Sequence, residues 1–197
     1  MDPGADDDVR IRLSEPMAEW AAGNFDHAVD LLEQLLTEME AEGPREDLGA
    51  LQVRHQLIVV YGYAERFTDA VELAERNLKS YQVLLGPEDL DTLQAQTDLA
   101  YAYTGVDRHD EAVTLMTETL EGYREAFGPD YPDTLDRQRA LAQFLWWAGR
   151  PDESIAVCEQ TLASCQRALG PDDGLTQEIA ANLEDIREEI RDGAAGG

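Results

Sequence analysis

Histidines, cysteines and carboxylates are the side chains of this sequence that could perform chemistry. His27, His55 and His109 could serve as metal ligands or general bases, but none has a second His or Cys at the spacing of a metal site. Glu184 and Glu188 lie four residues apart, as carboxylates of a di-metal site do, yet no Glu-x-x-His accompanies them and 42 acidic residues make such pairs frequent by chance. The sequence therefore predicts no catalytic residue, no cofactor and no metal site, and we expect no enzyme activity.

The two cysteines and the glycine-proline turns have simpler explanations than chemistry. Cys158 and Cys165 lie seven residues apart in what reads as one helix, so their Cα atoms would be roughly 10 Å apart, too far for a disulfide. We expect both to be reduced thiols in the core. The Gly-Pro turns lack the Lys-Ser/Thr pair and the preceding strand of a phosphate-binding loop.

These turns recur with a fixed period. Their glycines are 42 residues apart in three segments: Leu85-Gly86-Pro87-Glu88, Phe127-Gly128-Pro129-Asp130 and Leu169-Gly170-Pro171-Asp172. A fourth copy, Gly43-Pro44, lies 43 residues before Gly86. A second marker has the same 42-residue spacing: Ala28-Val29, Ala70-Val71, Ala112-Val113 and Ser154-Ile155. A period of this length indicates a repeat architecture with four copies.

Each repeat contains two predicted helices. Apolar residues at helical spacing follow each second marker: Leu32 and Leu36, Ala74 and Leu78, Met116 and Leu120, Cys158 and Leu162. The predicted helices span about residues 14–22, 26–41, 48–63, 68–84, 90–104, 109–126, 133–147, 152–168 and 174–190. We expect Asp91 and Thr92 to cap one helix start, and the turn glycines to end helices in a left-handed conformation.

The patterns predict an all-α solenoid of four helix-turn-helix repeats and a C-terminal capping helix. The predicted single domain spans residues 10–191, with repeats at about 14–42, 43–85, 86–127 and 128–169 and the cap at 170–191. Five apolar residues lie on one side of the cap: Leu175, Ile179, Leu183, Ile186 and Ile190. Residues 1–9 are expected to form an acidic disordered tail, and residues 192–197 a flexible Gly/Ala tail.

The charge of the chain limits its partners. With 42 acidic and 15 basic residues the net charge is −27, which repels nucleic acids and anionic membranes and favours a basic or mixed partner. The alternative is that the acidic faces only keep the protein soluble. No apolar stretch reaches the roughly 18 residues of a membrane helix, and the acidic start is unlike a signal peptide, so a cytoplasmic location is expected.

The helix-pair marker Gly23-x-Phe25-x-x-Ala28 resembles that of the tetratricopeptide repeat, as do Leu99, Ala100 and Tyr103 ahead of Ala112. The 42-residue period and the segment 128–135, Gly-Pro-Asp-Tyr-Pro-Asp-Thr-Leu, are similar to the kinesin light chain type of this family, which is also found in bacterial regulatory proteins. The resemblance covers about residues 14–190. It implies a right-handed superhelix in which the first helix of each pair lines a concave groove that binds peptides or partner domains.

The predicted groove differs from that of the family in one respect. Kinesin light chain repeats carry an Asn-Asn pair that can hydrogen-bond to a peptide main chain. The matching pairs here are His55-Gln56, Thr97-Asp98, Arg139-Ala140 and Ala181-Asn182, so only Asn182 remains. We therefore expect the groove to be selective through its own side chains instead of clamping any peptide main chain.

Helical steps around these positions place eight residues on the predicted groove: Gln52, His55, Gln94, Thr97, Tyr101, Arg139, Gln143 and Trp146. Arg139, with Arg137 as a second candidate, could bind a carboxylate, and Tyr101 and Trp146 are residue types common at binding hot spots. The alternative for Arg139 is an internal pair with Asp98 or Asp136. Trp146 and Trp147 point about 100° apart on a helix, so either one is at least partly exposed or both pack between helices.

The sequence favours a non-catalytic protein-protein interaction module that holds a peptide or partner protein, such as one bearing carboxylate groups, in this groove. One alternative is a self-assembling scaffold, for example a homodimer formed through the terminal helices. Another is a small-molecule-binding accessory protein of a biosynthetic pathway, which a closed apolar pocket near Trp146 and Tyr101 would favour. Partner identity, oligomeric state, and whether the chain is free-standing or part of a larger regulator stay open.

Overall fold

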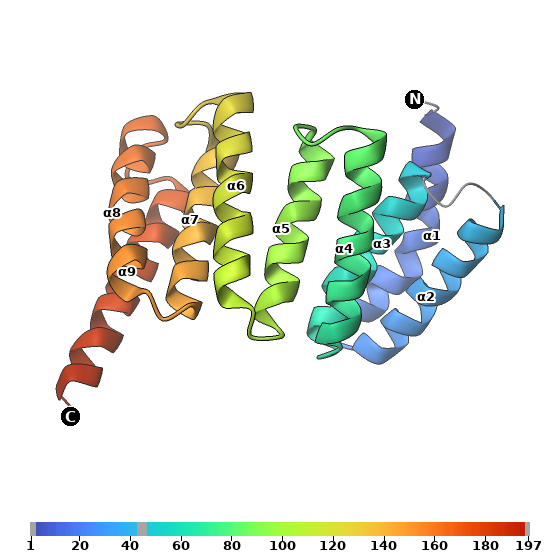
Figure 1. The fold of residues 1–197 in the computed structure, drawn as a ribbon, viewed down its shortest axis with the longest axis horizontal. Helices are drawn as coiled ribbons and strands as arrows, with labels where there is room; N and C mark the ends of the chain where they lie inside the picture. The colour runs from blue at the N-terminus through green and yellow to red at the C-terminus, as the bar shows by residue number, and fades with distance from the viewer. Residues whose placement is uncertain (1–2, 43–46, 196–197) are drawn as a thin grey trace. The chain divides into compact units, whose positions relative to one another are not determined.

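Helices account for most of the chain. The structure is a computed structural model that describes residues 3–42 and 47–195. Its helices are α1 (Pro3–Ala21), α2 (Phe25–Glu42), α3 (Leu48–Tyr63), α4 (Phe67–Leu84), α5 (Leu90–Thr104), α6 (His109–Phe127), α7 (Pro132–Trp147), α8 (Pro151–Ala168) and α9 (Gly174–Ala195) (Figure 1). The described residues include no strand. The chain is an all-α helical-repeat solenoid, as the sequence predicted, and its contacts divide it into two compact units, Met1–Asp107 and Arg108–Gly197.

The helix bounds agree with the sequence except at the two ends of the chain. Helices α2 to α8 begin and end within one residue of the predicted positions. Helix α1 begins at Pro3 instead of residue 14, so the prediction of a disordered tail over 1–9 was wrong for the part of it that the structure describes. Val9 is buried and lies against Gly49 of α3, an anchor that a single apolar residue in an acidic segment does not reveal. Helix α9 extends to Ala195, beyond the predicted end at residue 190.

The Gly-Pro turns end helices as predicted. Gly86, Gly128 and Gly170 have φ angles of 93°, 89° and 97°, a region that side chains with a Cβ rarely adopt. The matching turn at Gly43-Pro44 lies outside the described residues.

The expected cap of α5 was wrong, because the cap lies two residues before Asp91. The N-cap is Asp89, whose side chain accepts a hydrogen bond from the Asp91 amide at 3.0 Å. The Thr92 hydroxyl instead donates to the Gly86 carbonyl oxygen at 2.7 Å and ties the helix to the preceding turn. Asp91 is therefore not needed as a cap.

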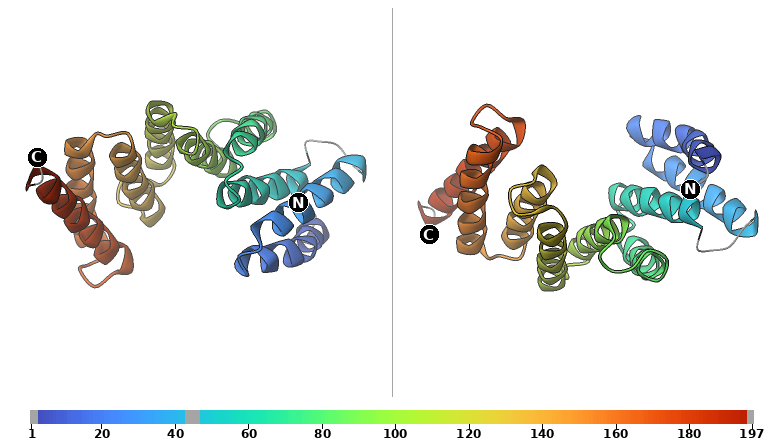
Figure 2. Two further views of the ribbon diagram at one scale, coloured as in Figure 1. Left: turned by 90° about the horizontal axis from the view of Figure 1, so that it is seen from below. Right: turned by 90° about the horizontal axis from the view of Figure 1, so that it is seen from above.

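Within the N-terminal unit, the first helices of successive repeats contact one another. Helix α3 packs against both α1 and α5, and the second helices α2 and α4 pack against these (Figure 2). Ala28 and Ala70, which begin the second marker of two repeats, are 0% and 2% exposed, so the stripe they begin forms core as predicted. As a result, the first helices α1, α3 and α5 lie next to one another.

In the C-terminal unit, neighbouring helices from α6 to α9 pack in chain order. Two clusters join α7, α8 and α9: Leu135, Cys165 and Ile179, and Ala142, Cys158 and Leu183. Both cysteines are buried free thiols, as predicted. Ile190, expected on the apolar side of the last helix, is 37% exposed.

Candidate binding surfaces

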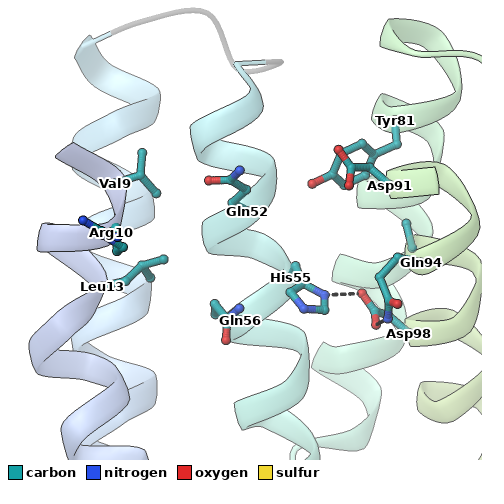
Figure 3. Close-up of a pocket in the computed structure, with 11 residues that line it drawn as sticks. Val9, Arg10, Leu13, Gln52, His55, Gln56, Tyr81, Asp91, Gln94 and Asp98 are labelled. Atoms are coloured by element: carbon teal, nitrogen blue, oxygen red, sulfur yellow. Dashed lines mark hydrogen bonds and ion pairs between the residues drawn. The ribbon is translucent and has the colours of Figure 1, made fainter. Parts of the chain in front are cut away.

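A pocket of about 490 Å³ opens on the first helices of the N-terminal unit (Figure 3). Its walls come from α1, α3 and α5, with one side chain from α4. Three of the predicted groove residues, Gln52, His55 and Gln94, line it together. The other lining residues are Val9, Arg10, Leu13, Gln56, Tyr81, Asp91, Ala95 and Asp98.

A hydrogen-bonded group joins α3 to α5 at the floor of this pocket. The His55 Nδ1 and Asp98 Oδ2 atoms are 2.5 Å apart, and the Gln94 Nε2 amide donates to Asp98 Oδ1 at 3.0 Å. Asp98 is 7% exposed, so its carboxylate is held almost entirely by these two side chains. Thr97, the neighbour predicted to face the groove, is 1% exposed and donates its hydroxyl to the Leu93 carbonyl oxygen, so that prediction was wrong.

The carboxylate of Asp98 favours the protonated form of His55. The hydrogen bond to Asp98 raises the pKa of His55 above its usual 6.5, and the charges of Asp98 and Asp91 act in the same direction against the opposing effect of burial. Because the folded-state pKa exceeds the unfolded one, this interaction stabilises the fold fully below about pH 6.5 and is lost as the pH rises through the folded-state pKa.

We expect Asp98→Asn to lower the free energy of unfolding by about 1.5 kcal/mol at a pH just below 6.5, and by less at pH values above the folded-state pKa. Denaturant unfolding at the two pH values measures the difference, and NMR titration of His55 gives its pKa in both proteins. In a His55→Gln background the effect of Asp98→Asn is expected to lose its pH dependence. An equal loss of stability at both pH values would contradict the assignment.

Two further groups on the α5 side of the pocket were not identified from the sequence. Tyr81 is 5% exposed and lies on α4, the second helix of its repeat. It occupies the same repeat position as Tyr123 and Cys165, which from the sequence indicates a core residue. Asp91 was interpreted as a helix cap. The side chains of both line the pocket, and burial followed by the charge of Asp89 raises the pKa of the Asp91 carboxyl. Burial and the nearby carboxylates also raise the pKa of Tyr81, which keeps its hydroxyl protonated.

A second pocket, of about 190 Å³, lies between α7 and α9 in the C-terminal unit and includes Arg139, Gln143 and Trp146. Arg139 donates to Asp136 Oδ1 from Nη2 at 2.8 Å and from Nε at 3.0 Å, and its Nη1 lies 3.3 Å from Glu178. Of the two internal pairs considered from the sequence, the one with Asp136 is therefore present. This pairing weakens the case for Arg139 as a receptor of carboxylates.

The aromatic residues of the predicted groove differ in their surroundings. Trp146 is half-buried beside the second pocket, and Trp147 is 39% exposed with its ring edge-on to Phe144 at 5.5 Å. The prediction that at least one tryptophan is partly exposed is thus confirmed. Tyr101 is 40% exposed on α5 and lines neither of these two pockets.

Within residues 3–42 and 47–195, no group of three or more His, Cys, Asp or Glu side chains is placed to hold a metal ion. No helix of this described part combines the length and the apolar character needed to cross a bilayer.

Stacked helix pairs define the chain as a helical-repeat protein. Tetratricopeptide repeat family profiles match residues 49–125 and 134–173, more than half of the chain together. The chain belongs to the tetratricopeptide repeat family. The search of curated proteins found no match.

Solved structures show the same fold at low sequence identity. A kinesin light chain-type protein of Podosopora anserina with nearly identical TPR-like repeats has a TM-score of 0.82 and 23% identity, over 95% of this chain and 88% of that one. BtubC (BKLC) from P. vanneervenii has a TM-score of 0.65 and 16% identity, over 89% and 78%. A Rap protein complexed with competence and sporulation factor has a TM-score of 0.70 and 16% identity, over 95% of this chain but 51% of that one. The resemblance to kinesin light chain-type repeats thus holds for the fold.

Proposed function

We propose that this protein is a non-catalytic interaction module that binds a partner protein or peptide on the exposed faces of its first helices. The observation that carries the proposal is the pocket bounded by α1, α3 and α5, because it draws its walls from the first helices of successive repeats. Membership in the tetratricopeptide repeat family supports a protein partner. The similar Rap structure, which contains a bound factor, is an example of this fold in a complex.

The charges around the pockets favour a basic or mixed partner over an acidic one. Asp91 and Asp98 line the first pocket together with one arginine, Arg10, and Asp185 and Glu189 line the second together with Arg139. Arg139, the residue expected to receive a carboxylate, already pairs with acidic side chains of its own unit. We therefore replace the carboxylate-bearing peptide expected from the sequence with a partner that presents cationic groups.

The pocket beside Trp146 does not support a small-molecule function. A closed apolar pocket would have favoured that alternative, but charged side chains of α7 and α9 line this one, and Tyr101 is not among its lining residues.

Arginine substitutions on the first helices test the proposal. Gln52 and Gln143 are exposed on α3 and α7, and Gln82 and Gln160 are exposed on the second helices α4 and α8. We expect Gln52→Arg or Gln143→Arg to reduce recovery of a specific partner about tenfold, because a bulky cation obstructs the binding face. The matched variants Gln82→Arg and Gln160→Arg should recover it like the parent protein.

The measurement is quantitative mass spectrometry of affinity pull-downs from cells that naturally express the protein, with circular dichroism as the check on folding. Partner recovery that is unchanged by both first-helix variants, or equally reduced by the second-helix variants, would overturn the proposed binding face.

A further inference from the structure

The acidic wall of the first pocket contains hydrogen-bond acceptors that the described residues do not satisfy. Asp91 is an exposed residue, and its carboxylate has no hydrogen bond or ion pair with any described side chain. Its backbone amide donates a hydrogen bond to Asp89 Oδ1. The Tyr81 hydroxyl also has no hydrogen-bond partner in the described chain. Figure 3 shows the Tyr81 hydroxyl pointing into the pocket beside Asp91.

Tyr81 distinguishes this site from a cluster of acidic surface residues, because it adds a hydroxyl from a packed side chain. Its side chain is 5% exposed, so the hydroxyl is carried to the pocket by a ring that is itself packed in the core. Because the hydroxyl faces the pocket, a ligand or water there can supply the hydrogen bond that the described residues do not. Together with the unpaired Asp91 carboxylate, it offers two acceptor groups on one side of the cavity.

The apolar part of the remaining walls suits the stem of a long cationic side chain. Val9 and Leu13 of α1 and Ala95 of α5 provide apolar surface, against which the methylene stem of a lysine or arginine could pack. Asp98 lies deeper, already bonded to His55 and Gln94. Arg10 lies on α1, across the pocket from Asp91 in Figure 3, so the two sides carry opposite charges.

We propose that the pocket between α1, α3 and α5 binds a basic side chain of a partner protein, with its cation between the Asp91 carboxylate and the Tyr81 hydroxyl. This inference rests on the proposed function and adds the side chains that receive the cation of the partner. The net charge of −27 attracts such a partner from a distance. Burial and the charge of Asp89 raise the pKa of Asp91, and a bound cation would act in the opposite direction by favouring the charged carboxylate.

The test uses the full chain and two small probes, Nα-acetyl-lysine methylamide and its uncharged analogue Nα-acetyl-norleucine methylamide. NMR follows the carboxyl resonance of Asp91 and the ring resonances of Tyr81. We expect the lysine probe to shift both saturably at millimolar concentration and to lower the pKa of Asp91. The norleucine probe should cause neither change, and higher ionic strength should weaken the response.

Asp133 provides a matched control variant. It lies 42 residues after Asp91, at the same position of the next repeat, and is exposed in the first turn of α7. Asp91→Asn is expected to weaken lysine-probe binding about tenfold and Tyr81→Phe several-fold, whereas Asp133→Asn leaves it unchanged. Tyr81→Phe keeps the packed ring, and thermal unfolding checks that each variant remains folded.

Three results would overturn the inference: no saturable response to the lysine probe, an equal response to norleucine, or equal losses in Asp91→Asn and Asp133→Asn. Equal losses in the two variants would mean that the net negative charge of the protein, and not the pocket, attracts the lysine probe. If these results appear while Gln52→Arg still reduces partner recovery, the proposed function stands and only the cationic subsite fails. If the probe binds as expected but both first-helix variants recover partners normally, the subsite stands and the proposed function fails.

Discussion

Replacing Glu40 with alanine is expected to destabilise the N-terminal unit by about 3 kcal/mol. Glu40 accepts a hydrogen bond from the Arg54 guanidinium at 2.7 Å, and the Arg54 side chain is 3% exposed. Arg54 also lies 3.5 Å from the Ser80 hydroxyl, so it links the second helices to α3. Removal of the carboxylate takes an acidic partner at 2.7 Å from a buried guanidinium, and the loss of one partner of a buried ion pair is strongly destabilising.

Denaturant unfolding and hydrogen exchange of α2 and α3 measure this effect. Arg54→Met, which removes the buried charge and keeps an apolar stem, is expected to cost less than Glu40→Ala. Glu72→Ala is the matched control, because Glu72 is an exposed acidic residue on α4. If Glu40→Ala were no more destabilising than Glu72→Ala, the buried ion pair would not be a significant contributor to stability.

Phe144→Ala is expected to cost about 4 kcal/mol in the C-terminal unit. Phe144 is 1% exposed, and its ring meets the Trp147 ring edge-on at 5.5 Å. Truncation removes buried apolar area and leaves a cavity beside the helix that carries Arg139, Gln143 and Trp146. The substitution should therefore disturb the second pocket as well as the fold.

Hydrogen exchange is the informative measurement here, since it reports protection in α7 and α8 separately from the N-terminal unit. Trp147→Ala serves as the comparison, because Trp147 is 39% exposed and its truncation should cost clearly less. Phe144→Leu should recover much of the lost stability by filling most of the cavity. Equal costs for Phe144→Ala and Trp147→Ala would contradict the assignment of Phe144 to the core.

The helices could be predicted from the sequence because the signals that define them are local. A Gly-Pro turn recurs at a 42-residue spacing, and apolar residues three and four apart select one buried face in each second helix. These features depend on neighbours within one or two turns of the same helix. The exception was α1, whose first turns are anchored by Val9 against Gly49, a contact between separate helices.

The side-chain partners of the groove residues could not be predicted from the sequence. Thr97 and Asp98 differ by one residue, which is about 100° of rotation around a helix, and only the packed structure shows Asp98 facing the pocket while Thr97 faces the core. His55 meets that carboxylate across 43 residues of sequence. From the sequence, Asp98 and Asp136 were both possible partners of Arg139, and in the structure Arg139 pairs with Asp136.

The sequence by itself determined the repeat period, the helix pairs and the family, because these depend on spacing along the chain. Tertiary structure decided which first-helix positions are open, which charges are already paired, and that a core tyrosine delivers its hydroxyl to a pocket. The physical reason is that a polar side chain acquires its role from the partners that packing brings to it, and a repeat pattern specifies packing faces but not those partners.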